Sequence, residues 1–151
     1  MEPTTIKELD DWMTANCYTD NRYAIAGRFI AEGYGIDKID DFYIWFYTER
    51  GERQTLQTFQ TEQEVVAFAL PKLLADKYAR RHMVGFIKGE EKTAELIAEL
   101  KTRNIDFYQD KLLYRKDDYR VRIFVFNCDI NKVLDLQVKY GWPKGQLGGV
   151  P

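Results

Sequence analysis

The residues from Asp41 to Phe59 constrain the fold more than any other stretch of the chain. Phe42 to Tyr47 are six large aromatic or β-branched residues in a row, and such residues fit the pleated surface of a strand. The polar segment Thr48 to Glu52 contains a glycine and is typical of a hairpin turn. Arg53 to Phe59 then returns as the partner strand. The sequence therefore predicts an antiparallel hairpin at the centre of the fold.

The first strand of this hairpin has two chemically different faces, because side chains alternate across a strand. The face that we expect to pack against the core is wholly apolar and consists of Phe42, Ile44 and Phe46. The opposite face carries rings with polar tips and consists of Tyr43, Trp45 and Tyr47. Such a face is either covered by a second layer or open to a partner, and the sequence leaves both alternatives open.

Helices are predicted on both sides of the hairpin. Thr5 with Glu8, and Thr61 with Glu64, form capping boxes that mark two helix starts. Two later helices are expected at 90–103 and from Asp129 onward. Further strands are expected at 22–31, 107–115 and 119–126, and the glycine-containing stretches 32–40 and 82–89 are expected to be connections.

This order predicts an α+β fold in which antiparallel hairpins pack with about four helices. At 151 residues the chain is expected to form a single domain. Helix, strands with a polar turn, and capped helix occur twice, which suggests an internal duplication of an αββα-like unit with halves 1–86 and 87–143. The glycine-rich tail 144–151 is expected to be loosely ordered.

The charge is unevenly distributed along the chain. Residues 1–50 hold 5 Lys/Arg and 10 Asp/Glu, whereas residues 51–151 hold 17 and 14, which gives the overall net charge of −2. An acidic N-terminal third argues against a nucleic-acid-binding site in this part of the chain and favours a basic partner.

The sequence favours a cytoplasmic location. No apolar run approaches the ~20 residues that span a membrane, and the N-terminus lacks the pattern of a signal peptide. Cys17 and Cys128 lie far apart in the sequence and imply no disulfide framework, so we expect both to be reduced.

Residues that could support catalysis are scarce. His82 is the only histidine, and with two separated cysteines it matches no common zinc pattern. There is no glycine-rich phosphate loop and no nucleophile elbow. We therefore expect no cofactor, no metal and no enzymatic activity; a small enzyme that uses His82 as a general base is the weakest alternative.

Two surfaces are candidates for binding. The first has aromatic anchors with an acidic rim that would attract a basic partner, and its residues are Asp37, Asp40, Asp41, Tyr43, Trp45, Tyr47 and Glu49. The second is a strand face that mixes bases and aromatics, as nucleic-acid-binding sheets do, and its residues are Arg120, Arg122, Phe124 and Phe126. A nucleic-acid-binding or nucleotide-binding regulatory module is therefore the main alternative to a protein-binding function.

The hairpin and the start of the following helix resemble a known family. Tyr47-Thr48-Glu49-Arg50-Gly51-Glu52-Arg53, Leu56, Phe59 and Thr61-Glu62-Gln63-Glu64-Val65-Val66 are similar to a pattern in bacterial immunity proteins. These proteins accompany contact-dependent growth inhibition systems and other polymorphic toxins. The resemblance covers about 30 residues and implies a cytoplasmic, non-enzymatic antitoxin that binds one cognate toxin domain, often a nuclease, and occludes its active site. It assigns no inhibitory residue.

Overall fold

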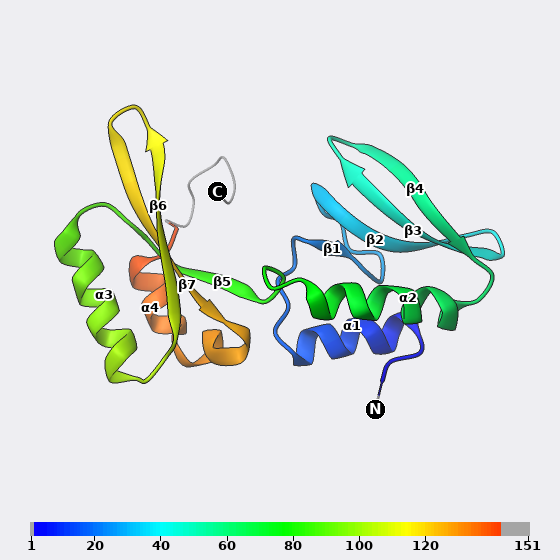
Figure 1. Ribbon diagram of the computed structural model, residues 1–151, viewed down its shortest axis with the longest axis horizontal. Helices are drawn as coiled ribbons and strands as arrows, with labels where there is room; N and C mark the ends of the chain where they lie inside the picture. Colours follow the sequence, from blue (N-terminus) through cyan, green and yellow to red (C-terminus); the bar gives the residue numbers. More distant parts are fainter. Residues whose placement is uncertain (1, 143–151) are drawn as a thin grey trace. The chain divides into compact units, whose positions relative to one another are not determined.

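The computed structural model describes residues 2–142 and has an α+β fold (Figure 1). The chain divides into two compact units, Met1–Arg80 and Arg81–Pro151, each with its own sheet. The sequence predicted one domain with a division after residue 86. The boundary instead lies after Arg80, because residues 81–87 form a strand of the second sheet. The predicted tail 144–151 lies outside the described residues.

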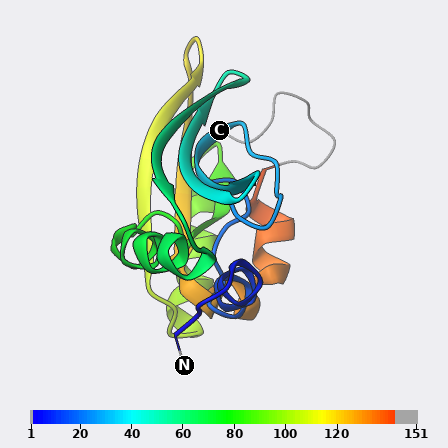
Figure 2. The ribbon, with the colours of Figure 1, turned by 90° about the vertical axis from the view of Figure 1, so that its right-hand side faces the viewer.

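The first unit places a four-stranded sheet, sheet A, against two helices. Its elements in chain order are α1 (Ile6–Ala15), β1 (Tyr23–Ala24), β2 (Glu32–Ile39), β3 (Phe42–Glu49), β4 (Glu52–Phe59) and α2 (Glu62–Ala75). The strands follow one another across the sheet in the order β1-β2-β3-β4, with β1 parallel to β2 and the other pairs antiparallel. The two helices lie side by side along the sheet, and β2 to β4 are visibly curved (Figures 1 and 2). The predicted hairpin of β3 and β4 is confirmed.

Both faces of β3 contain buried residues, and the helices cover the face that the sequence did not assign to the core. Trp45, which is 3% exposed, belongs to the main core with residues of α1 and α2, whereas Phe42 is 49% exposed. Ile44 and Phe46 are buried on the opposite face, in a small separate cluster with Ala24 and Ile30. The assignment of Phe42 to the core was therefore wrong, and the helices cover the face of Tyr43 and Trp45.

Strand β2 occupies the stretch that the sequence analysis took for a connection. Gly35 lies where a Cβ atom would come within 2.6 Å of both the Ala24 carbonyl oxygen and the Phe46 ring. The short parallel strand β1 can therefore pair with β2 only if position 35 has no side chain. The glycine that suggested a loop serves close packing of two strands.

The helix starts agree with the sequence. At α1, Glu8 N donates to Thr5 Oγ1 and Thr5 N donates to the Glu8 carboxylate, which completes the capping box. Ile6 N donates to Glu62 Oε2 at 2.7 Å, so the first acid of α2 satisfies a further free amide of α1. This bond ties the two helices together beneath sheet A. Pro71 lies inside the continuous helix α2.

The second unit contains a three-stranded antiparallel sheet, sheet B. Its elements are β5 (Arg81–Ile87), α3 (Glu90–Thr102), β6 (Phe107–Arg115), β7 (Asp118–Phe126), the 3₁₀ helix η1 (Asn127–Lys132) and α4 (Leu134–Tyr140). The strand order is β5-β7-β6, so the two sheets differ in connectivity and the topology lends the predicted duplication no support. The stretch 82–89, expected as a connection, is mostly strand, and the expected last helix is divided at Val133 into η1 and α4.

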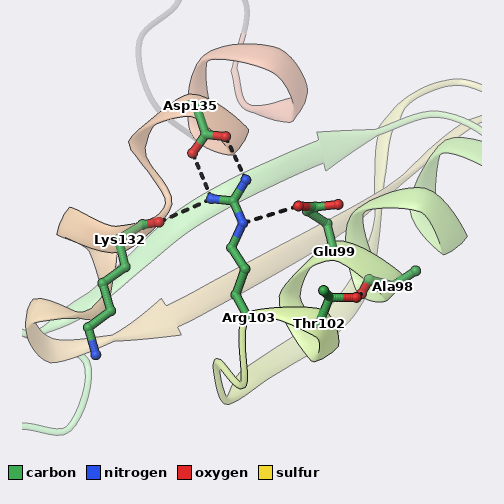
Figure 3. A network of polar contacts seen from close by, with 6 residues as sticks. All are labelled: Ala98, Glu99, Thr102, Arg103, Lys132 and Asp135. Carbon is green, nitrogen blue, oxygen red and sulfur yellow. Dashed lines mark hydrogen bonds and ion pairs between the residues drawn. The ribbon is translucent and has the colours of Figure 1, made fainter.

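A single arginine joins the helical segments of the second unit (Figure 3). The Arg103 guanidinium makes two hydrogen bonds with the Asp135 carboxylate, at 2.8 and 2.7 Å. It also donates to Glu99 Oε1 at 3.2 Å and to the Lys132 carbonyl oxygen at 3.1 Å. Because these partners belong to α3, η1 and α4, Arg103 fixes the end of α3 against the start of α4.

Neither Cys17 nor Cys128 is a free thiol in the structure. The expectation that both cysteines are reduced was therefore wrong. Thiols are normally kept reduced in the cytoplasm, so this finding does not support the predicted cytoplasmic location. Among residues 2–142, no helix is long and apolar enough to cross a membrane.

The different burial of Trp45 and Phe42 predicts effects of different size for two aromatic substitutions in β3. Trp45→Ala leaves a cavity in the core and is expected to lower the free energy of unfolding by about 3–5 kcal/mol. Phe42→Ala removes a half-exposed ring and is expected to cost about 1 kcal/mol or less. Urea unfolding of both variants measures the difference. A larger loss for Phe42→Ala would restore the assignment made from the sequence.

The Arg103–Asp135 pair predicts a pH-dependent contribution to stability. The hydrogen bonds from Arg103 lower the pKa of Asp135 to about 2, against about 3.9 in an unfolded chain. A carboxyl with a lowered folded-state pKa stabilises the fold above the unfolded pKa, and this contribution is lost as the pH falls through about 2. The stability difference between wild type and Arg103→Met should therefore be largest above about pH 4 and shrink towards pH 2.

Thermal melts between pH 2 and pH 7 measure this difference. Lys139→Met is the matched control, because it removes a cation from α4 that forms no ion pair within the described residues. A difference between wild type and Arg103→Met that stays constant over this range would contradict the assigned role of the pair.

The absence of a free thiol at Cys17 and Cys128 predicts how the protein reacts with a thiol reagent before and after reduction. Protein purified without reductant and then denatured should expose no thiol to a colorimetric thiol reagent. After reduction, both cysteines of the chain should react. Two reactive thiols before reduction would show that the cysteines are not disulfide-bonded in solution.

Candidate partner-binding surface

The two units differ in charge. Residues 1–80 carry 9 Lys/Arg and 14 Asp/Glu, a net charge of −5, whereas residues 81–151 carry 13 and 10, a net charge of +3. The acidic character predicted for the N-terminal third therefore belongs to the unit built on sheet A. A basic partner would be attracted to this unit.

The acidic and aromatic side chains of sheet A meet at the end of the sheet where β3 turns into β4. We call this set the Tyr–Glu surface, and it consists of Glu32, Tyr34, Tyr47, Glu49 and Glu52. In the strand register, Tyr34 lies opposite Tyr47, Glu32 opposite Glu49, and Glu49 opposite Glu52. Each of three neighbouring strands thus contributes one glutamate to a row across the sheet. The two tyrosines lie directly beside this row.

The tyrosine pair is held in a defined position. The Tyr34 ring stacks on the buried Trp45 indole at 5.6 Å with 10° between the ring planes, and it contacts Tyr47 at 5.0 Å. Tyr47 Oη donates a 2.9 Å hydrogen bond to Glu32 Oε1. This hydrogen bond raises the pKa of Tyr47 to about 12, so the phenol stays protonated at neutral pH. The exposed Tyr34 ring and the half-buried Tyr47 ring are therefore rigid extensions of the core.

The three glutamates keep their negative charge uncompensated. All three are exposed, and none forms an ion pair with a residue that the structure describes. Side chains directly opposite each other on neighbouring strands lie about 5 Å apart, and like charges at this separation are destabilising. The row therefore gives the isolated sheet no stability, but it creates a negative potential at this end.

Two of the residues proposed as aromatic anchors are not on an open surface. Trp45 is buried in the core of the first unit, where its ring contacts Tyr23, Tyr34 and Phe68. Its assignment as an anchor was wrong, because α2 covers this part of the sheet. Tyr43 is half-buried against the same core, with the Lys38 ammonium 5.7 Å from its ring centre. Of the three predicted anchors, only Tyr47 belongs to the Tyr–Glu surface.

The predicted acidic rim is split between opposite ends of sheet A. Asp40 and Asp41 form the turn between β2 and β3 and are exposed there. Glu49 is the last of the eight residues of β3 and Asp41 directly precedes the first, so the two are about 25 Å apart at ~3.3 Å per residue. Asp37 forms an ion pair with Arg53 at 2.6 Å, so its charge is compensated within the sheet. Glu49 is the one predicted acid beside Tyr47.

The sequence analysis missed Glu32, Tyr34 and Glu52 as members of the surface. Glu32 and Tyr34 lie in the stretch that was interpreted as a connection, and Glu52 was assigned to the turn. The signal that could have found them is the register of β2 and β4 against β3, which places Glu32 and Glu52 on either side of Glu49.

The alternative surface on sheet B has its positive charge neutralised internally. Arg122 forms a bidentate ion pair with Asp110, and Arg120 forms one with Asp118. The guanidinium groups also lie over rings of the same sheet, with Arg122 5.1 Å from the centre of the Phe124 ring. Phe124 is buried, and Phe126, the fourth predicted member, is half-buried. Nucleic-acid binding relies on cations that are free to neutralise phosphates, and these two arginines already have carboxylate partners.

His82, the candidate general base, belongs to the second unit. This residue lies within β5, opposite Val125 of β7. Within residues 2–142, no group of three or more His, Cys, Asp or Glu side chains is arranged to hold a metal ion. The Tyr–Glu surface is therefore taken as the candidate site.

Comparisons of the chain with protein-family models, with curated proteins and with solved structures found no significant match.

Proposed function

We propose that the protein is an immunity protein that binds a cognate bacterial toxin domain and blocks its active site. The observation that carries the proposal is the Tyr–Glu surface, where a row of three uncompensated glutamates lies beside a rigid pair of tyrosines. The resemblance of residues 47–66 to immunity proteins supports the same class of function. The partner is a protein domain with a basic active-site surface, such as a nuclease.

Electrostatics support a basic partner. Repulsion within the glutamate row is relieved when lysine or arginine side chains approach it, so the row favours the complex over the free protein. A negative potential at the edge of a binding surface also steers a basic partner and raises the association rate. A toxin that binds nucleic acid must present cations to the phosphates, and the glutamates can occupy the same positions.

The tyrosines support a tight complex. Tyrosine is enriched among the residues that contribute most of the binding energy in protein interfaces. Tyr34 and Tyr47 are already held by Trp45 and Glu32, so little conformational entropy is lost when a partner covers them. In this proposal the protein needs no catalytic step and no cofactor, and it acts by excluding substrate from the toxin.

Charge reversal at the two ends of β3 tests the proposal. The assay uses the toxin-like C-terminal domain encoded by the neighbouring upstream gene, which the immunity function predicts. Wild-type protein should rescue the growth of cells that express this domain and should bind it tightly in calorimetry. Glu49→Lys is expected to weaken binding by about tenfold or more, mainly through slower association, and to reduce the dependence of the association rate on salt.

Asp41→Lys is the matched control, since it reverses an equally exposed charge in the turn at the other end of β3. It should leave rescue and affinity close to wild type. Failure of the wild-type protein to bind or protect would refute the proposed function. Equal losses for both variants would show that only the overall charge matters and would remove the Tyr–Glu surface from the proposal.

A further inference from the structure

Phe29 is the most exposed large hydrophobic side chain that the structure describes. Its ring is 90% exposed, whereas the other exposed aromatic residues of the first unit are between 41% and 49% exposed. A fully exposed phenylalanine in water gains nothing from hydrophobic burial. Single exposed apolar residues are common on protein surfaces, so its surroundings decide whether this exposure has a function.

The segment that carries Phe29 is held on both sides. Ile25 is fully buried in the main core, and Ile30 is buried in the small cluster on the opposite face of sheet A. Between them, Arg28 N donates to the Ile25 carbonyl oxygen at 3.3 Å. The Arg28 guanidinium forms a 3.0 Å ion pair with Asp10 of α1. The backbone beside Phe29 is thus fixed from two directions, while its ring is left in solvent.

Phe29 lies close to the Tyr–Glu surface. It precedes Glu32 by three positions, and an extended chain covers at most about 3.6 Å per residue, so the two Cα atoms are within about 11 Å. Glu32 is the outer member of the glutamate row and accepts the hydrogen bond from Tyr47. The backbone of Phe29 therefore lies near the same end of sheet A as the uncompensated acids.

We infer that Phe29 is the apolar anchor of the interface with the toxin domain and inserts into a hydrophobic pocket that is bordered by lysine or arginine side chains. This inference rests on the proposed function and names a residue that dominates the affinity. Binding anchors combine a large ring in a pocket with a surrounding rim that excludes water. Phe29 supplies the ring, and Glu32, Glu49 and Glu52 supply a rim that selects a cationic border.

The negative charge of the glutamate row favours a basic toxin domain over two other possible partners of Phe29, a second copy of the chain and a membrane. A second copy of the chain would bring an identical row of glutamates close to the first, which like-charge repulsion opposes. A membrane with anionic lipids would be repelled by the same acids. A basic protein surface satisfies both the ring and the carboxylates.

Binding of the purified toxin domain from the neighbouring gene to three variants tests the inference. Phe29→Ala is expected to raise the Kd at least 30-fold, the effect typical of an anchor residue, mainly through faster dissociation. Phe29→Leu, which keeps an apolar side chain, should lose less. Phe42→Ala is the matched control, because it removes an exposed phenylalanine from the other end of β3 and should change the Kd by less than threefold.

The outcomes separate the two proposals. No binding by wild type refutes the proposed function and the anchor with it. Tight wild-type binding with an unchanged Kd for Phe29→Ala refutes the anchor alone. Unchanged melting temperatures confirm that the variants are folded. Sedimentation of the free protein and flotation with anionic vesicles should show a monomer and no vesicle binding. A dimer or vesicle complex abolished by Phe29→Ala would assign the ring to one of those occupants instead.

Discussion

The packing of Trp45 is the interaction on which the first unit depends. Its indole contacts Tyr23 of β1, Tyr34 of β2 and Phe68 of α2, so one side chain joins two strands and a helix to the centre of sheet A. The stack continues outward from Trp45 to Tyr34 and then to Tyr47. The exposed Tyr34 and the half-buried Tyr47 are therefore positioned by the core, so the surface proposed to bind a partner is as rigid as the sheet.

The sequence predicted local features better than the contacts between distant segments. The capping residues Thr5 and Thr61 located two helix starts, because caps act within four residues. Alternation along β3 separated its residues into two sets correctly. It could not show which set the helices cover, since Trp45 and Phe42 are both large enough for a core. Gly35 was misinterpreted because its role is to let β1 approach, and β1 is a two-residue strand.

The candidate surface was predictable only in part, because its residues come together through strand pairing and not through closeness in the sequence. Asp40, Asp41 and Glu49 are close to the aromatic residues in the sequence, but β3 carries the two aspartates to the opposite end from the glutamate. Glu32 is 17 positions before Glu49 and yet is its direct cross-strand neighbour. Strand register decides which charges meet. On sheet B, Asp110 and Arg122 show the same effect, because register pairs them and removes the free positive charge that the sequence suggested.

The most direct test of the account is the location of the interface on the protein itself. Backbone amide chemical shifts can be compared between free protein and its complex with the toxin domain from the neighbouring gene. The account predicts changes concentrated at residues 28–34 and 47–53, with the Asp40–Asp41 turn and the β6–β7 hairpin largely unaffected. Changes centred on Asp40–Asp41 or on the strands of sheet B, with residues 28–34 unaffected, would contradict it.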